Sequence, residues 1–466
     1  MNRPRLILSG LSGGAGKTIL TLGLCRAWRR KGRCIQPFKK GPDYIDAAWL
    51  GLAARAPASN LDPFLMSEDI LKSLFLHASA NADLSLIEGN RGIFDGMDLL
   101  GSCSTAVVAR MLDAPVVLIL DCTKMTRTAA AIVAGCMAFE PECHIAGVIL
   151  NRTAGERHRN ILRQCIEHYA GIPVLGTLPK LASNPIPERH MGLVSNREFE
   201  GQETILESLA DIAADFLDLD SLWEIGQSAP PFPDSGALRP LWPQLGALRR
   251  PLARIGYVRD AALWFYYEEN LEALRQAGAE LVELSLLTAE PWPDIHGLYL
   301  GGGFPETQAR ELAANRVVRQ RVRTCAELGM PIYAECGGFM YLAESLVWQG
   351  EKLPMAGVFP VRTEVCEKPQ GLGYVEAEVV HENPFFECGA RVRGHEFHYS
   401  RCFAADGAVL SLGLKLAKGE GILAHYDGLI YKNTFATYMH THALGFPDWA
   451  RNFVSAAGRF REEAAG

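Results

Sequence analysis

The chain has 466 residues, which is too long for one ordinary hydrophobic core, so two or three domains are expected. Its 48% hydrophobic and 21% charged residues are typical of a soluble globular protein, and the formal net charge of -7 argues against a general affinity for nucleic acid or acidic membranes. No run of about 18 apolar residues occurs, the N-terminus lacks a signal-peptide pattern, and the 12 cysteines follow no disulfide framework. We therefore expect a cytoplasmic protein with no membrane or nucleic-acid partner, and a homodimer stays open.

Short apolar segments alternate with helix-like segments through the first half of the chain. Four of them are predicted to be buried strands, at residues 6–8, 84–87, 115–120 and 146–150. Because parallel strands buried on both faces read as short apolar runs, this pattern predicts an α/β domain with a doubly wound parallel sheet. Ligands should then bind at the carboxyl ends of its strands.

A glycine-rich loop follows the first of these strands and precedes a predicted helix over residues 19–29. It reads Ser9-Gly10-Leu11-Ser12-Gly13-Gly14-Ala15-Gly16-Lys17-Thr18. Backbone N–H groups in such a loop cradle phosphates, while Lys17 reaches the β- and γ-phosphates and Thr18 holds Mg²⁺. Leu11 replaces the first glycine of the usual spacing, which gives the deviant loop of dethiobiotin synthetase and the partition ATPases. The residues predicted to bind ATP are Gly13, Gly14, Gly16, Lys17 and Thr18.

Three carboxylates lie where this fold places the γ-phosphate and its metal. Asp43 follows a predicted second strand, Glu88 ends a predicted third strand, and Asp95 lies in the glycine-rich loop after it. Because Mg²⁺ and phosphoryl transfer require hard oxygen ligands, Thr18, Asp43 and Glu88 are candidate metal ligands. Solvated loop carboxylates are the alternative interpretation. The nearby cations that could bind phosphate or substrate carboxylates are Lys39, Lys40 and Arg91.

A proline-rich segment separates this pattern from a second α/β pattern. Predicted strands at residues 253–258, 297–300 and 331–334 again alternate with helix-like segments. We therefore divide the chain into a first domain over 1–227, a linker over 228–251, a second domain over 252–450 and a C-terminal helix or tail over 451–466.

Cys336 ends the last of these apolar runs, in Pro331-Ile332-Tyr333-Ala334-Glu335-Cys336-Gly337-Gly338-Phe339-Met340. The order predicts a strand, a sharp turn and a helix, with the thiol at the helix N-terminus, where the dipole favours a thiolate. This is the cysteine counterpart of a nucleophile elbow, so acyl transfer through a thioester is the first hypothesis. A buried structural cysteine is the alternative.

A thiolate nucleophile requires oxyanion donors and a base. Gly302 and Gly303 follow another predicted strand and, with Gly337, can direct backbone N–H groups at an oxyanion. The candidate bases are His440, His442, His395 and His398. His440 ends an apolar strand-like run, and His442 lies two residues later, on the same face if the strand continues. A histidine metal site is disfavoured, because no spacing typical of zinc enzymes occurs.

Five motifs occur together and in one order, and together they are highly specific. They are Pro37-Phe38-Lys39-Lys40-Gly41-Pro42-Asp43-Tyr44-Ile45-Asp46, Glu88-Gly89 through Phe94-Asp95-Gly96, Gly302-Gly303-Phe304-Pro305-Glu306, Glu335-Cys336-Gly337-Gly338 and Gly394-His395-Glu396-Phe397-His398-Tyr399-Ser400. On these motifs the chain resembles the cobyrinic acid a,c-diamide synthase family over essentially its full length. The resemblance implies a synthetase domain of dethiobiotin-synthetase type followed by a class I glutamine amidotransferase domain. It also implies ATP-dependent amidation of the a- and c-acetate side chains of a corrinoid in cobalamin biosynthesis, with L-glutamine as nitrogen donor.

The resemblance assigns roles to individual positions. Cys336 matches the glutaminase nucleophile, and His440 matches the histidine that activates it. The acidic positions tied to ATP, Mg²⁺ and the intermediate are matched by Asp43, Glu88 and Asp95. Tyr44 and Ile45 lie where the family contacts its tetrapyrrole. Class I amidotransferases usually carry Glu two residues after the active histidine, and His442 stands there instead, so a Cys–His dyad is expected.

Other functions remain open at this point. The loop after Glu88 reads Gly89-Asn90-Arg91, where many relatives have Val-Met after the glycine, so hydrogenobyrinic acid and nickel-sirohydrochlorin are alternative macrocycles. A nucleotide-switched binding protein would explain residues 1–150 but not Cys336 or His440. A scaffold with an inactive glutaminase is a third interpretation, against which the intact cysteine and histidine argue.

Overall fold

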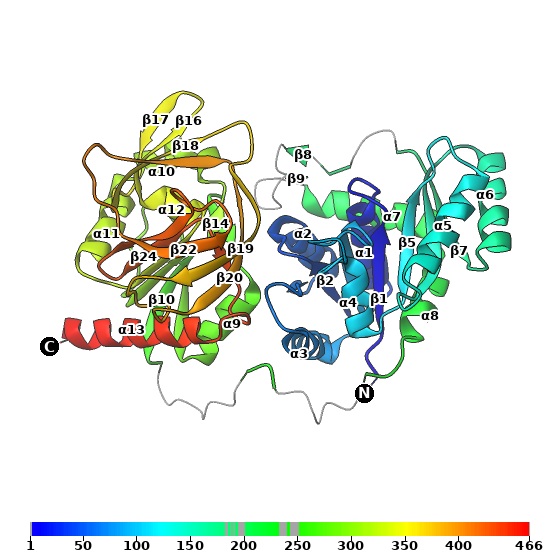
Figure 1. The fold of residues 1–466 in the computed structure, drawn as a ribbon, viewed down its shortest axis with the longest axis horizontal. Coiled ribbons are helices and arrows are strands. Elements are labelled where there is room, and N and C mark those ends of the chain that lie inside the picture. The colour runs from blue at the N-terminus through cyan, green and yellow to red at the C-terminus, as the bar shows by residue number, and fades with distance from the viewer. Residues whose placement is uncertain are drawn as a thin grey trace. The chain divides into compact units, whose positions relative to one another are not determined.

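The computed structural model describes residues 2–181, 185–186, 188–189, 192–193, 201–232, 240–242 and 251–465. The chain forms two compact units, Met1–Leu241 and Trp242–Gly466 (Figure 1). Of the predicted linker, residues 233–239 and 243–250 lie outside the described residues. Its beginning packs on the first unit, because Phe232 is buried and stacks on Phe75. No helix in the described ranges combines the length and the apolar composition needed to cross a membrane.

The first unit contains a seven-stranded sheet in which every strand pair is parallel. Its strands are β1 (Arg5–Gly10), β2 (Ile35–Lys40), β3 (Ser59–Leu61), β4 (Leu84–Gly92), β5 (Val116–Asp121), β6 (Ile145–Thr153) and β7 (Val174–Pro179). The order β3-β2-β4-β1-β5-β6-β7 places β1 at the centre, with the chain winding first to one side and then to the other. This confirms the predicted doubly wound sheet.

Helices connect these strands and cover the sheet. They are α1 (Lys17–Arg30), α2 (Tyr44–Ala54), α3 (Glu68–Ala78), α4 (Thr105–Leu112), α5 (Arg127–Phe139), α6 (Glu156–Tyr169), α7 (Gln202–Phe216) and α8 (Leu219–Gln227). The short helix η1 (Ser79–Asn81) and the hairpin of β8 (Glu188–Arg189) and β9 (Gly192–Leu193) complete the unit. The phosphate-loop helix α1 packs against α2 and α7.

The second unit is built on a ten-stranded mixed sheet in the order β12-β10-β13-β15-β24-β23-β22-β19-β20-β25. These strands are β10 (Ala253–Val258), β12 (Ala279–Leu284), β13 (Gly297–Leu300), β15 (Ile332–Glu335), β19 (Gly371–Val379), β20 (Arg391–His398), β22 (Leu412–Lys418), β23 (Tyr426–Tyr431), β24 (Thr434–Thr437) and β25 (His440–Thr441). A four-stranded sheet holds β16 (Ala343–Trp348), β17 (Glu351–Pro354), β18 (Phe359–Val365) and β21 (Ser400–Ala404), and β11 (Leu263–Phe265) pairs with β14 (Gly302–Gly303). The helices are α9 (Glu268–Gln276), η3 (Pro305–Gln308), α10 (Ala309–Ala314), α11 (Arg316–Glu327), α12 (Gly337–Leu342) and α13 (Asp448–Ala465).

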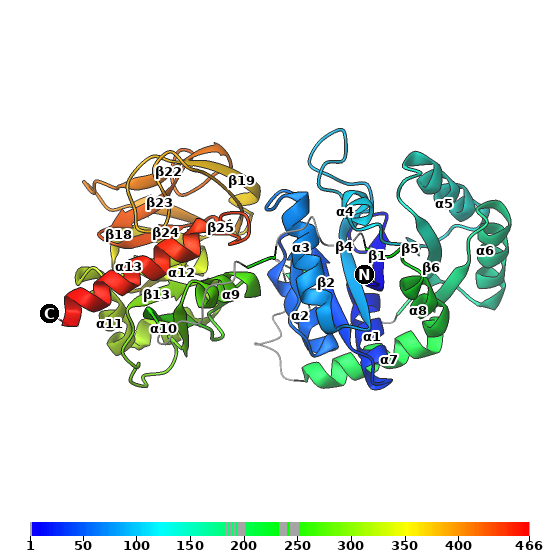
Figure 2. The same ribbon diagram turned by 90° about the horizontal axis from the view of Figure 1, so that it is seen from below.

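Alternate side chains of the central strands fill two cores. Leu298 in β13 and Ile332 in β15 belong to one buried apolar cluster, whereas the residue after each of them, Tyr299 and Tyr333, belongs to the other. This alternation is what a sheet covered on both faces requires. Helix α13 packs against α9 (Figure 2). It also packs against β10 and buries Trp449 in the second cluster, so the C-terminal segment is an integral part of the unit.

Candidate active sites

The predicted nucleophile turn is present between β15 and α12. Cys336 has φ 46° and ψ −98°, a combination that L-residues rarely adopt, and its thiol is buried with 5% of the residue exposed. Its N–H donates to the carbonyl of Thr437 at 2.7 Å, which ties the turn to the neighbouring strand β24. Sparsely populated backbone conformations of this kind cluster at active sites, where surrounding contacts hold them.

The three predicted oxyanion glycines lie together beside this turn. A Cβ on Gly302 would collide with Cε1 of His440 and lie 3.3 Å from its Nε2. A Cβ on Gly337 would lie 2.9 Å from the backbone nitrogen of Gly303. The structure therefore brings Gly302, Gly303, Gly337 and His440 into one site. No side chain fits at Gly302 or at Gly303, so both positions require glycine.

His440 does not continue the strand that precedes it. The run predicted as one strand divides into β24, which pairs with β15, and β25, which pairs with β20 at the far edge of the sheet. Asp427 causes the division, because its buried carboxylate accepts hydrogen bonds from the Thr437 hydroxyl at 2.7 Å and from the N–H groups of Tyr438 and Met439 at 3.1 Å each. Although β25 lies far from β15 in the strand order, the N–H of Thr441 in β25 donates to Oε1 of Glu335 at the end of β15 at 3.1 Å.

A carboxylate accompanies His440 that sequence reasoning missed. Nδ1 of His440 lies 3.4 Å from Oε2 of Glu335, the residue directly before the nucleophile. The Cys–His dyad stays a prediction, and Glu335 is a candidate third member that the sequence analysis did not name. One signal was available, because a glutamate at the end of an apolar, fully buried strand is rare unless its charge is paired.

Burial sets the electrostatics of the nucleophile. It raises the pKa of the Cys336 thiol, and the nearby carboxylate of Glu306 adds to this effect. Burial also lowers the pKa of His395, whose ring stacks on His440 with 4.9 Å between centroids. An isolated thiolate is thus unfavourable here, and Cys336 can react as a thiolate only when a base takes its proton.

The predicted phosphate loop joins β1 to α1 in the first unit. Gly16 has φ 97° and precedes the first residue of α1, and a Cβ there would collide with the side-chain amide of Asn151. That amide donates to the carbonyl of Ala15 at 2.8 Å, so Asn151 supports the loop. Nζ of Lys17 donates to the carbonyls of Ser12 and Arg91, at 2.8 Å each, and so lies across the loop. In this position its charge would pair with a bound phosphate.

Glu88 is the centre of a buried charge cluster beside this loop. It lies inside β4, which continues to Gly92, and not at a strand end as predicted. Its Oε1 accepts from Nζ of Lys39 at 2.6 Å and from the hydroxyl of Thr18 at 2.8 Å, and Lys39 also pairs with Asp46 at 2.5 Å. Its Oε2 is buried and has no hydrogen-bonding partner in the described ranges, which suits an oxygen that binds a metal or a metal-bound water.

Burial dominates the ionisation of this cluster. It raises the pKa of Glu88 against the opposing effect of Lys39, and burial together with Asp46 raises the pKa of Asp43 to about 7. Burial opposes the charge on Lys39, but the carboxylates of Asp46, Glu88 and Asp43 outweigh it and raise its pKa. Asp43 also caps α2, accepting from the N–H of Asp46 at 2.9 Å. A cation is the natural partner for so many buried carboxylates.

The remaining predicted substrate residues surround the same end of the sheet. Lys40 ends β2, and burial lowers its pKa. Tyr44 and Ile45 form the first turn of α2 and are largely buried. Asp95 is exposed and accepts from the N–H of Gly92 at 2.8 Å. Burial lowers the pKa of Lys17, and the charges of Glu88 and Asp95 are among those that oppose this shift.

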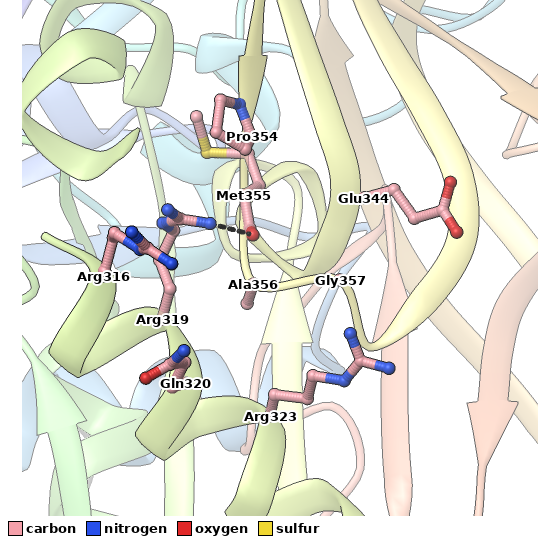
Figure 3. A pocket seen from close by; sticks show the side chains of 9 residues that line it. All are labelled: Arg316, Arg319, Gln320, Arg323, Glu344, Pro354, Met355, Ala356 and Gly357. Carbon is pink, nitrogen blue, oxygen red and sulfur yellow. Dashed lines mark hydrogen bonds between the residues drawn. The ribbon is translucent and has the colours of Figure 1, made fainter. Parts of the chain in front are cut away.

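A further cavity in the second unit lies apart from the predicted site residues. Among the described residues, no group of three or more His, Cys, Asp and Glu side chains is arranged to hold a metal ion. A cavity of 410 Å³ lies between α11 and the segment that follows β17 (Figure 3). Its lining residues are Arg316, Arg319, Gln320, Arg323, Glu344, Pro354, Met355, Ala356 and Gly357. None of the predicted site residues lines it, and Arg319 donates to the carbonyl of Met355 at 3.1 Å.

Comparison with known families finds one match within each of the two units of the chain. The family described as "CobQ/CobB/MinD/ParA nucleotide binding domain" matches residues 6–194, and "CobB/CobQ-like glutamine amidotransferase domain" matches residues 254–447. Among solved structures, PurLQS from Thermotoga maritima has 19% identity and a TM-score of 0.35, covering 46% of this chain and 99% of that chain. A glutamine amidotransferase crystal structure has 21% identity and a TM-score of 0.34, covering 44% and 98%.

Several curated proteins match along nearly the whole chain, and each carries the name cobyrinate a,c-diamide synthase. The protein of Magnetococcus marinus is 42% identical and covers 96% of both chains. That of Listeria innocua is 40% identical over 94% of this chain and 96% of its own. That of Methanothermobacter thermautotrophicus is 38% identical over 98% of this chain and 100% of its own.

Proposed function

Because the chain belongs to the cobyrinate a,c-diamide synthase family and is a glutamine-dependent ligase of cobalamin biosynthesis, we propose that its substrate is cobyrinic acid, amidated on the a- and c-acetates. ATP activates each carboxylate, and glutamine supplies the nitrogen. The use of glutamine and ATP is carried by one observation: the turn of the buried Cys336 adjoins the glycines that contact His440, in a chain that also holds a phosphate loop.

We assign glutamine hydrolysis to the second unit. The sulfur of Cys336 attacks the side-chain amide carbon of glutamine while His440 accepts the thiol proton. Backbone N–H groups of Gly303 and Gly337 stabilise the oxyanion of the tetrahedral intermediate. The C–N bond then breaks, His440 returns the proton to the leaving nitrogen, and ammonia departs. Water hydrolyses the remaining thioester to glutamate and restores the thiol.

Amide formation is assigned to the first unit. An oxygen of the substrate carboxylate attacks the γ-phosphorus of ATP, so that ADP leaves and an acyl phosphate forms. Lys17, whose Nζ lies between the carbonyls of Ser12 and Arg91, stabilises the negative charge that develops on the transferred phosphoryl group. Ammonia then attacks the acyl carbon and displaces phosphate. Mg²⁺, held by Thr18, Asp43 and Glu88, would neutralise charge on the phosphate oxygens of ATP.

The substrate is proposed to bind at the carboxyl end of the first sheet. Lys40 is suited to a substrate carboxylate. Burial opposes its positive charge and lowers its pKa, and a bound carboxylate would stabilise that charge. Tyr44 and Ile45 would contact the apolar macrocycle, and Asp95 would handle the intermediate beside Lys17.

None of the 12 cysteines, all within the described ranges, forms a disulfide bond, which supports the proposed cytoplasmic location.

One assay tests the substrate and the division of labour together. Cobyrinic acid, hydrogenobyrinic acid and nickel-sirohydrochlorin are offered separately with ATP and glutamine, and the mass gain per amide is followed. We expect two amides on cobyrinic acid, and preference for another macrocycle would replace the substrate named here. Cys336→Ala should abolish the reaction with glutamine but retain it with ammonium salts. Loss of both reactions in a folded variant would contradict the assignment of the two half-reactions.

A further inference from the structure

We propose that Glu335 is the positioning residue of His440, so that the nucleophile and the carboxylate that orients its base are sequence neighbours. The proposal rests on the glutaminase function proposed above. It assigns the acid to the end of β15, whereas the amidotransferase class usually carries it two residues after the histidine, where this chain has His442.

The orientation of the His440 ring carries the first step. Nδ1 faces Oε2 of Glu335 at 3.4 Å, while Cε1 and Nε2 are the ring atoms closest to Gly302. A carboxylate at Nδ1 therefore leaves Nε2 directed at the oxyanion loop, where a base must meet the nucleophile. The distance is long for a hydrogen bond, and such contacts commonly tighten only when substrate is bound.

Glu335 is itself held in place. The side chain is fully buried, and its Oε1 accepts from the N–H of Thr441 at 3.1 Å. Its Oε2 accepts from the hydroxyl of Tyr299 at 3.3 Å, and Asn270 donates to that hydroxyl at 3.2 Å and to the carbonyl of Thr441 at 2.8 Å. A buried carboxylate with fixed donors on both oxygens is a preorganised partner for an imidazolium that forms during reaction.

His442 belongs to a different pair. Its Nδ1 accepts from the N–H of Leu444 at 3.3 Å, and its Nε2 lies 3.6 Å from Oε2 of Glu269. Its ring packs against Tyr267 with 4.5 Å between centroids. Each of the two histidines therefore has its own buried glutamate, and Glu269 provides a matched control for Glu335.

Several other titratable groups face this site. His395 on β20 stacks on His440, and Tyr267 lies 3.3 Å from Nδ1 of His395. The charges of Glu306 and Asp427 act on Cys336. His395 therefore lies against the ring face of His440, whereas the carboxylate of Glu335 lies at its Nδ1.

The test compares Glu335→Gln with Glu269→Gln in the full chain. For Glu335→Gln we expect the kcat of glutamine hydrolysis to fall by about 10²- to 10⁴-fold with little change in KM, because the residue acts through His440. Amidation with ammonium should persist, and Glu269→Gln should keep both the kcat and the KM of glutamine hydrolysis.

A second variant covers the case in which Glu335→Gln does not fold. Tyr299→Phe keeps the carboxylate but removes one donor to it, and should lower kcat by about 3- to 30-fold without loss of the ammonium reaction. An unchanged kcat in the folded variants would overturn the proposal. So would an equal effect of Glu269→Gln. Failure of Cys336→Ala to abolish glutamine use would instead overturn the glutaminase assignment itself.

Discussion

At the scale of single residues, Asp427 connects the electrostatics of the second unit to its stability. Its carboxylate is fully buried and accepts hydrogen bonds from Thr437, Tyr438 and Met439. The hydrogen bonds favour the ionised form, but the desolvation caused by burial outweighs them and raises the pKa to about 6. The protein therefore carries an ionised carboxylate at neutral pH at some expense in stability, in order to fix the segment that leads to His440.

A pH-dependent prediction follows from that shift. Because the native state binds this proton more tightly than the unfolded chain, the contribution of Asp427 to the free energy of unfolding is fully present below pH about 4 and is lost as the pH rises to about 6. The loss amounts to about 3 kcal/mol. Asp427→Asn should therefore become more stable relative to the parent by about this amount between pH 4 and 7.

Unfolding by urea at several pH values checks the prediction. Asp406→Asn provides the control, because Asp406 is exposed in the same unit and should show no such trend. A stability difference between Asp427→Asn and the parent that does not vary with pH would show that the carboxylate does not titrate differently in the two states.

At the scale of elements, the phosphate loop and α1 act as one device. Lys17 opens the helix, and Lys31 lies just past its other end, where it forms an exposed ion pair with Asp220. Lys17→Ala should reduce amidation by about 10²- to 10³-fold with either glutamine or ammonium, because a preorganised charge at the transferred phosphoryl group is lost. Glutamine hydrolysis should persist, and Lys31→Ala should behave as the parent. Product formation and glutamate release, measured side by side, separate these outcomes.

The sequence predicted long regular elements well and irregular ones poorly. The apolar strands around β1 and the strand–turn–helix at Cys336 are present, because burial on both faces leaves a strong signal in the residues. The three-residue β3 was missed, and β4 extends past Glu88, because strand length depends on pairing with neighbours. The division between β24 and β25 involves Asp427, about ten residues earlier, and has no local signal. The burial of Glu335 at the end of an apolar strand was a local signal of a paired charge, but its partner His440 lies 105 residues away in the sequence.

At the scale of the whole molecule, each unit has its own sheet and its own buried residues. The first is centred on β1, and the second has two apolar clusters that contain Leu298 and Tyr299, respectively. Units with separate cores commonly fold alone. We therefore predict that residues 1–241 amidate the substrate with ammonium, and that residues 242–466 hydrolyse glutamine, each within about tenfold of the full chain.

Separate production of the two pieces tests this prediction. Soluble pieces that show cooperative unfolding but no activity would indicate that each half-reaction requires the other unit. Mixing the pieces would then reveal whether contact alone restores activity.

The backbone of Cys336 has a consequence for the evolution of such proteins. A non-glycine residue at φ 46° and ψ −98° costs about 1–3 kcal/mol, and glycine would relieve that strain. Under the proposed role of Cys336 as nucleophile, stability and catalysis favour different residues at this position, and selection for glutamine use maintains the cysteine. In a lineage fed by free ammonia, glycine should replace Cys336 more readily than alanine does, leaving a recognisable trace of the lost activity.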